Sequence, residues 1–461
     1  MVKAARWLTA ALFAFSLAAV FGTHAFAQAQ TGPTAAPTTH IEVNALPPAG
    51  VANFDPHKAV NAYLARVSGK DRARSDAYFE GGYVLIFVDT FYAVVLAGLL
   101  LWLRISARMR DAAIKATQFR LFGLRVFRFF RTPIYVAQYL AATTVATLPL
   151  SIYETFIREH AYGLSNQTFP QWAGDFGKSF LVTLIGFTLL LTAIYAAMRA
   201  VKRSWWVWAT VITVVFLAIQ SMIYPVYIAP LFNRYAPLPD SAMKSTILSL
   251  ARANGIPADN VYTYDASRQT TRISANVSGF LGTTRISLSD NLLNDCTPSE
   301  VLAVMGHEMG HYVMDHMAIL ITWFGLLFLA GFVFVDWGFR RLAATFGGRW
   351  GVQGIDDPAG LPLLVALFSV FMMLATPVTN TIVRTQEIQA DIFGLNAVRL
   401  PDAFATVVLK LSTYRKLSPG PWEEFVFFDH PSGRTRIWEA MRWKAEHIND
   451  PDVMAGPMSP Q

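Results

Sequence analysis

The segment His307-Glu308-Met309-Gly310-His311 holds the residue types of a metal-dependent hydrolase at the spacing of one helical turn. Two histidines four residues apart lie on one face of a helix, so both imidazoles can bind the same zinc ion. Glu308 lies beside that face, where it can act as general base toward water activated by the metal. Thr297-Pro298-Ser299-Glu300 is a capping box with proline at the first helical position, which predicts that the segment is helical.

A hydrolytic zinc ion needs a third protein ligand and keeps a fourth position open. A metzincin would have a histidine six residues after His311, but positions 314 and 317 are both Met, which excludes that class. Glu387 is the main candidate, and Asp391, one turn later, could orient a ligand histidine.

Other interpretations of these residues stay open at this point. Pattern alone favours a solvated helix face for residues 384–391, and Asp315 and His316 are weaker candidates for the third ligand. The cluster His430-Pro431-Ser432-Gly433-Arg434-Thr435-Arg436 could stabilise an oxyanion or hold a substrate carbonyl. Taken alone, that cluster favours a turn with a solvated basic face.

Six apolar runs must position these side chains, and each is near the ~20 residues that span a bilayer as a helix. The runs are 82–103, 133–153, 180–198, 205–227, 317–335 and 361–383. The last two form a hairpin that returns the chain to the side of the membrane it left, so Glu387 can meet His307 and His311. Asp89, the one charged residue inside the runs, is either functional or lines a polar interior.

A more polar insert, residues 228–316, separates the fourth and fifth runs. Helical spacing over 242–254 and short strands at Val261–Tyr264 and Arg285–Leu288 predict a small α+β unit. A second polar segment, 384–461, ends the chain.

The composition agrees with a membrane protein. Of 461 residues, 54% are hydrophobic and 15% charged, against about 25% charged in soluble domains, which argues against a soluble enzyme and a disordered chain. The net charge of +7 resides in short segments beside the apolar runs, which indicates membrane orientation and no nucleic-acid partner. The single cysteine, Cys296, excludes an intrachain disulfide and a cysteine-based zinc site.

The N-terminus predicts a signal peptide over residues 1–27, with an uncleaved first membrane helix as the alternative. Residues 28–55 are expected to form a linker. The basic loops 104–132, 199–204 and 339–360 fall on one side of the membrane, which positive-inside logic assigns to the cytoplasm. The polar insert and the C-terminal segment then face outward.

With these residues placed, the chain resembles the type I CAAX prenyl endopeptidases, integral-membrane zinc metallopeptidases of the gluzincin kind. The resemblance covers about residues 75–445. The motifs that carry it are Leu148 to Phe156, His160 to Thr168, Tyr227 to Asn233, Ser267-Arg268, Gly279-Phe280, Asp290 to Leu293, the HExxH helix, Glu387 with Asp391, and His430 to Arg436.

The resemblance implies a ring of membrane helices around a water-filled chamber that the zinc domain closes at one end. It also implies roles for seven side chains. The zinc ligands would be His307, His311 and Glu387, and Glu308 would be the catalytic base. Asp391 would support a ligand, and His430 and Arg436 would contact the substrate or the transition state.

Two departures from the family pattern bear on the substrate. The family's Asn-Ala at the substrate-binding strand edge is Ser274-Ala275 here, followed by Asn276. Addition of a peptide to the strand backbone would survive this difference, whereas a side-chain contact would be at risk. The apparent signal peptide leaves six membrane helices instead of seven. The loop charges place the active site outside, which makes a prenylated cytosolic protein a poor substrate.

The sequence therefore predicts a mainly α fold: a multi-pass membrane helix bundle around a chamber with an inserted α+β zinc metallopeptidase domain. The expected parts are 1–27, 28–55, an N-terminal membrane domain at 56–235, the zinc metallopeptidase domain with two membrane helices at 236–445, and a tail at 446–461.

The predicted function is a membrane-embedded endopeptidase with one Zn²⁺, in a bacterial inner membrane with its active site in the periplasm. Its expected partners are membrane lipids and peptide or protein substrates from the membrane or envelope. The alternatives are CAAX-type C-terminal processing of lipidated proteins and a non-catalytic membrane scaffold or transporter. A transporter is disfavoured because no paired short or broken helices occur at matching positions.

Overall fold

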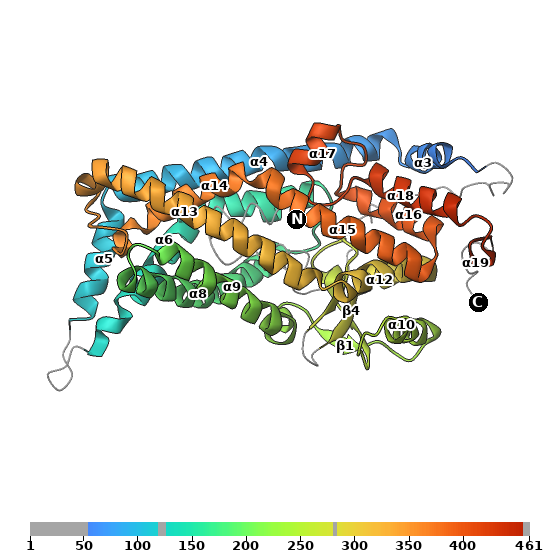
Figure 1. The fold of residues 1–461 in the computed structure, drawn as a ribbon, viewed down its shortest axis with the longest axis horizontal. Helices are drawn as coiled ribbons and strands as arrows, with labels where there is room; N and C mark the ends of the chain where they lie inside the picture. Colours follow the sequence, from blue (N-terminus) through green and yellow to red (C-terminus); the bar gives the residue numbers. More distant parts are fainter. Residues whose placement is uncertain (1–53, 119–125, 280–283, 455–461) are drawn as a thin grey trace.

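The computed structural model describes residues 54–118, 126–279 and 284–454. The predicted signal peptide and nearly all of the predicted linker lie outside these residues. The described chain is an elongated body of long helices with a small sheet toward one end (Figure 1). The end that carries α5 (Ile105–Ala116) lies opposite the end that carries the sheet.

Five helices among the described residues are long and apolar enough to cross a membrane, and each coincides with one of the first five predicted runs. They are α4 (Gly69–Trp102), α6 with its continuation (Phe127–Ala161), α8 (Phe169–Ala200), α9 with its continuation (Trp205–Leu231) and α13 (His316–Trp350). Within them, α6 itself is Arg131–Ile152, α7 is Arg158–Ala161 and α9 is Trp205–Ile223. The 34 residues of α4 span about 50 Å, so this helix continues well beyond a hydrocarbon core of about 30 Å.

The sixth predicted run is not one straight membrane helix. It divides into α14 (Leu361–Leu374) and the first part of α15 (Thr376–Val398), which meet at Ala375 with a bend of 57°. The physical reason is Pro377, near the start of α15, because proline lacks an amide hydrogen and clashes with the carbonyl of the preceding turn. The bend aims the second half of α15 at the HExxH helix.

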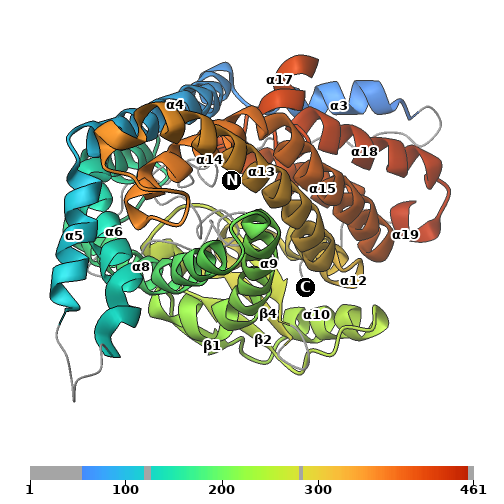
Figure 2. The ribbon, with the colours of Figure 1, turned by 60° about the vertical axis from the view of Figure 1, so that its left-hand side comes forward.

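The remaining helices lie mostly around the sheet and beside α15. They are α3 (Pro56–Ala65), α10 (Ala242–Ala253), α11 (Asp290–Asp295), α12 (Pro298–Val313), α16 (Pro401–Lys410), α17 (Pro421–Phe427), α18 (Gly433–Glu446) and α19 (Pro451–Met454). The predicted helix at 242–254 is confirmed as α10. The views in Figures 1 and 2 agree that α12 lies between α15 on one side and the sheet with α10 on the other.

The sheet has four strands in the order β1-β2-β4-β3. The strands are β1 (Tyr235–Pro237), β2 (Val261–Tyr264), β3 (Ala275–Ser278) and β4 (Arg285–Ser289). The central pair β2 and β4 is parallel and matches the two predicted strands, while β1 and β3 pair antiparallel at the edges. Ile286 and Leu288 of β4 pack against Met305 and Met309 of α12, so the sheet supports the HExxH helix from behind.

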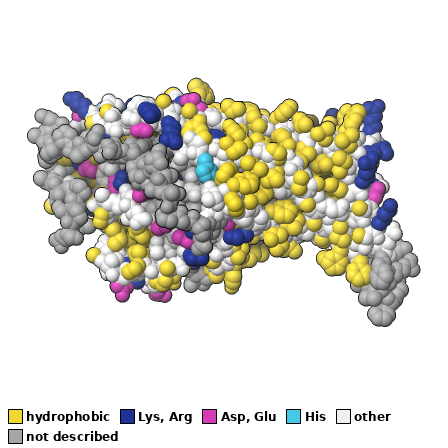
Figure 3. All heavy atoms as spheres, turned by 180° about the vertical axis from the view of Figure 1, so that it is seen from behind, with side chains coloured by type: hydrophobic (Ala, Val, Ile, Leu, Met, Phe, Trp, Pro, Cys, Tyr) yellow, Lys and Arg dark blue, Asp and Glu magenta, His cyan; other side chains and the backbone are white. Residues whose placement is uncertain are grey.

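On the face shown in Figure 3, apolar side chains cover the middle of the molecule and basic side chains gather at the α5 end. Inside the bundle, Asp89 is buried, as are several hydroxyls. Those of Thr188, Thr192 and Tyr195 on α8 have no hydrogen-bond partner among the described residues. Buried hydroxyls of this kind are normally satisfied by water, which fits a hydrated interior.

Candidate metal centre

The HExxH helix α12 begins as its sequence predicts. The Thr297 side chain accepts a hydrogen bond from the Glu300 amide, and the Glu300 side chain accepts one from the Thr297 amide. Pro298 is the first residue of the helix. Lys410 of α16 lies 2.6 Å from the Glu300 carboxylate, which ties the start of the helix to its neighbour. Met305 and Met309 are fully buried against the sheet, so His307 and His311 face the opposite side, toward α15.

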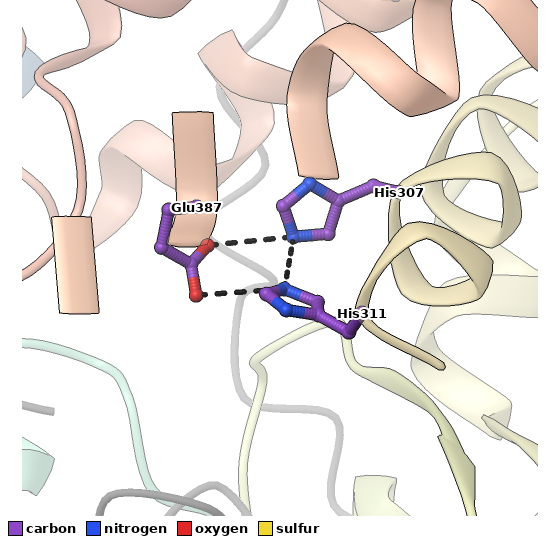
Figure 4. A group of neighbouring side chains, drawn as sticks. All are labelled: His307, His311 and Glu387. Carbon is purple, nitrogen blue, oxygen red and sulfur yellow. Dashed lines mark hydrogen bonds and ion pairs between the residues drawn. The ribbon is translucent and has the colours of Figure 1, made fainter. Parts of the chain in front are cut away.

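Glu387 of α15 meets both histidines (Figure 4). The two Nε2 atoms of His307 and His311 are 3.1 Å apart, and the Glu387 oxygens lie 3.4 Å and 3.6 Å from them. Zinc bonds of about 2.0–2.2 Å in tetrahedral geometry place ligand atoms about 3.3–3.6 Å apart. Two imidazoles and a carboxylate are also a known donor set for catalytic zinc, so these three side chains fit the ion.

Close packing of α12 on α15 makes this meeting possible. Gly306 and Gly310 of α12 face Gly394 and Ala390 of α15. A Cβ atom on Gly394 would lie 2.8 Å from the backbone nitrogen of His307, so only glycine allows the two helices to approach this closely. The distance between Glu387 and the histidines therefore depends on this contact.

Asp391 and Arg436 fix the orientation of His307. The Asp391 Oδ1 atom lies 2.7 Å from His307 Nδ1, so Nδ1 donates to the carboxylate and Nε2 is left free to bind a metal. Arg436 donates to both Asp391 oxygens, at 2.8 Å and 2.5 Å. The resemblance implies a substrate contact for Arg436, but its guanidinium is buried and directed at Asp391.

His316 lies beside His311 as Asp391 lies beside His307. The two Nδ1 atoms are 2.9 Å apart, and His316 Nε2 lies 3.2 Å from Gln389 Oε1. If His311 binds a metal through Nε2, its Nδ1–H donates to His316, whose own N–H then donates to Gln389. His316 is therefore placed to orient His311, whereas Asp315 lies at the left-handed turn between α12 and α13.

The three titratable side chains of the HExxH motif differ in their pKa values. Burial lowers the pKa of His307, but hydrogen bonds to Asp391 and Glu387 outweigh burial and raise it to about 10. Burial lowers the pKa of His311 to about 3. Burial also raises the pKa of Glu308 to about 7, which is close to the value that suits a general base at neutral pH.

His430 approaches the centre from the loop between α17 and α18. Its Nε2 lies 3.0 Å from Glu387 Oε2, and its Nδ1 lies 3.0 Å from Asp429 Oδ1. Asp429 has no signal in the sequence beyond its position next to His430, and Gln389 has none at all. Their roles follow only from the folded arrangement.

Residues 274–276 lie at an open edge of the sheet. Ala275 and Asn276 belong to β3, which pairs only with β4, so its other edge is free of strands among the described residues. Ser274 precedes the strand, where its amide donates to Ser289 Oγ. β3 also packs directly on α12, so the free edge runs past the HExxH helix.

Two family models match consecutive parts of the chain. Peptidase family M48 matches residues 237–444, and the CAAX prenyl protease N-terminal domain, described as five membrane helices, matches residues 57–234. An uncharacterized metalloprotease of Bacillus subtilis, YhfN, is 36% identical over 318 residues, which cover 68% of this chain and 74% of that protein. The chain belongs to peptidase family M48.

The CAAX prenyl protease resemblance is also confirmed. CAAX prenyl protease 1 of Saccharomyces cerevisiae is 28% identical over 317 residues, 64% of this chain and 68% of that protein. The crystal structure of S. mikatae Ste24p matches with a TM-score of 0.68 at 21% identity and covers 84% of this chain and 94% of that one. The helical membrane bundle with its chamber and inserted peptidase domain is the fold of this chain, and its activity is that of a membrane zinc metalloendopeptidase.

Proposed function

We propose that His307, His311 and Glu387 hold a single zinc ion and that this chain cleaves peptide bonds in membrane or envelope proteins. The observation that carries the proposal is the spacing of the three donor atoms, between 3.1 and 3.6 Å, at the meeting of α12 and α15. The hydrogen bonds of Asp391 and His316 to the far nitrogens of the two histidines support it, because they leave both Nε2 atoms facing the centre.

When bound, zinc would polarise the substrate carbonyl and lower the pKa of the attacking water. Glu308 accepts a proton from that water as its oxygen bonds to the carbonyl carbon. It then passes the proton to the departing nitrogen as the carbon–nitrogen bond breaks. Asp429 orients His430, whose Nε2–H faces Glu387 in the metal-free protein and would turn to the substrate carbonyl oxygen once Glu387 binds the metal. Arg436 keeps Asp391 charged and in place.

The β3 edge at residues 274–276 binds the substrate as an added strand. Its backbone supplies hydrogen bonds whatever the peptide sequence, so the Ser274 that stands in place of the family's Asn does not prevent binding. This mode suits unfolded or extended segments of envelope proteins.

The decisive experiment is peptide cleavage by the purified protein with Glu308→Gln as the matched control. Substrates are one unprenylated unfolded polypeptide and one prenylated CAAX peptide. Turnover should fall at least about 10²-fold in Glu308→Gln while zinc content stays at one per chain. Normal activity in a zinc-loaded Glu308→Gln protein would contradict this mechanism.

CAAX-type processing is the second candidate, because several relatives are named CAAX prenyl protease 1 homologs, among them those of Oryza sativa and Homo sapiens. Preference for the prenylated peptide in the same assay would favour it, and preference for the unfolded polypeptide would favour envelope proteolysis.

The site faces the periplasm of a bacterial inner membrane in this proposal. Exposed basic residues at the α5 end support it, since positive-inside logic assigns that end to the cytoplasm. They include Arg104, Arg108, Lys115, Lys202, Arg203, Arg340, Arg341 and Arg349. Alkaline phosphatase fused after residue 461 should be active, because this enzyme needs the periplasm. Green fluorescent protein fused at the same position should be dark, and fluorescence there would show that the orientation is reversed.

A further inference from the structure

Helix α17 (Pro421–Phe427) is amphipathic in the sense opposite to a helix in water. Its outer face carries Trp422, which is 80% exposed, and Phe425, which is 45% exposed, with their rings in edge contact at 6.1 Å. Its two carboxylates, Glu423 and Glu424, are directed at the protein. A water-facing helix keeps its charges outside and its aromatics inside, so this arrangement calls for an apolar neighbour.

The inward face of α17 is held firmly. Glu423 accepts hydrogen bonds from Tyr83 at 2.7 Å and Lys416 at 2.8 Å, and Phe427 stacks on the Tyr83 ring at 4.1 Å. Asn380 of α15 donates to the carbonyl of Val426 at 2.7 Å. The aromatic pair is therefore presented outward by a fixed helix and is not the loose end of a loop.

The surroundings of α17 are the lipid-facing parts of membrane helices. Val84 and Phe87 of α4 follow directly on Tyr83 and are exposed. Leu374 and Val378, on either side of the α14–α15 bend, are exposed as well. In Figure 1, α17 lies at the edge of the molecule above α15 and beside α4. The aromatic face thus continues an apolar surface that ends where the polar peptidase domain begins.

We propose that α17 lies in the interface of the bilayer, with Trp422 and Phe425 inserted between the lipid headgroups and the acyl chains. Exposed aromatic side chains are enriched at the boundary between the lipid headgroups and the acyl chains. Interfacial helices bury their apolar face about 5–10 Å into that region. The bilayer is the occupant that fits, because the patch is continuous with the membrane-spanning surface.

This placement ties the zinc centre to the membrane surface. Arg384, one turn before Glu387 on α15, donates to the carbonyl of Glu424 within α17 and to that of Phe428 directly after it. Glu424 accepts from the amide of Ser432, two residues after His430. Lipid contact at α17 therefore holds both the α15 segment and the His430 loop at a fixed depth next to the bilayer.

Spin labels in reconstituted bilayers test the proposal. The full chain carries Cys296→Ser and one cysteine at a time, at Trp422 or Phe425, with Phe91 of α4 as the membrane control and Ser245 of α10 as the aqueous control. Both control sites are exposed. Collision with oxygen and with a water-soluble nickel chelate then gives the depth of each label.

The expected result is oxygen access with exclusion of the nickel chelate at 422 and 425, at a depth of about 5–10 Å and shallower than the label at 91. Nickel access equal to that at 245 would overturn the proposal, since α17 would then face water. Low access to both reagents would also overturn it, because it would mean that another protein surface, such as a second copy of the chain, covers α17. Two sites on one face guard against failure of a single variant.

Discussion

The two histidines that we propose as zinc ligands differ in protonation in the metal-free protein. His307, with its pKa raised to about 10 by Asp391 and Glu387 against the effect of burial, is protonated at pH 7. His311, whose pKa is lowered to about 3 by burial, is neutral. Zinc binds only the unprotonated nitrogen, so it competes with a proton at His307 alone.

Zinc binding at pH 7 should therefore release about one proton from His307. The sign follows from the raised pKa: below about pH 10, each unit of decrease weakens apparent zinc affinity about tenfold through this group. Calorimetry in buffers of different ionisation enthalpy measures the release. Glu308→Gln is the suitable background, because Glu308 itself titrates near pH 7 in the metal-free protein.

Asp391→Asn supplies the comparison for this prediction. The variant weakens the acceptor for His307, so the pKa of His307 and the number of released protons should both decrease. Unchanged proton release in Asp391→Asn would show that another group carries the proton.

At this scale the sequence points to the proposed zinc ligands more readily than to the side chains that orient them. The spacing of His307 and His311 is local, and a helix translates it directly into geometry. Arg436 meets Asp391 across 45 residues of chain, so no spacing rule connects them. His316 reaches His311 because the chain turns at Asp315 with φ of 53°, a conformation that the sequence gives no reason to expect.

Among the elements, the contact between α12 and α15 decides whether a metal site exists. Gly394→Ala should force α15 away from α12, because its Cβ would meet the His307 backbone at 2.8 Å. Overpacking of this kind costs about 1–3 kcal/mol of stability. The loss in zinc-binding free energy should exceed the loss in free energy of unfolding, because Glu387 moves with α15. Zinc affinity by chelator competition and the thermal midpoint measure the two effects.

Gly348→Ala on α13 is the matched control, since nothing lies within 4 Å of its Cβ. It should leave zinc affinity unchanged and should stabilise slightly, if at all, because alanine favours helix over glycine. Equal zinc affinity in Gly394→Ala and Gly348→Ala would show that the helix contact does not set the ligand distance.

Hydropathy predicted the elements of the membrane domain but not their full extent. The runs 82–103 and 317–335 became helices of 34 and 35 residues, because amphipathic and polar extensions continue them outside the apolar stretch. The bend at Ala375 had a visible signal in Pro377, yet a window of mean hydropathy does not register one proline.

The whole molecule depends on how the membrane helices hold the substrate edge of the sheet. Arg272, three residues before β3, donates to Glu159 at 2.7 Å and to the Tyr78 hydroxyl at 3.0 Å. Tyr78 in turn donates to Glu159 at 2.8 Å, so α4, α7 and the loop before β3 meet in one buried ion pair. Asn291 holds the same loop through the carbonyl of Arg272.

Glu159→Gln should therefore destabilise the protein by about 3–5 kcal/mol, since it leaves the buried Arg272 charge without its counterion. Glu159→Gln with Arg272→Gln should cost less than the sum of the two single changes, because no unpaired charge remains. Glu446→Gln, which breaks the exposed pair with Arg442, should cost less than about 1 kcal/mol and serves as the control.

Peptide cleavage separates a local role of this ion pair from general stability. If the pair sets the position of β3, the Glu159→Gln and Arg272→Gln variants should show a raised KM for extended peptides below their unfolding temperature, while bound zinc stays at one per chain. The proposed zinc ligands lie on α12 and α15 and do not contact this pair, so their geometry should be preserved. An unchanged KM with lowered thermal stability would assign the pair to stability alone, and β3 would then owe its position to its packing on α12.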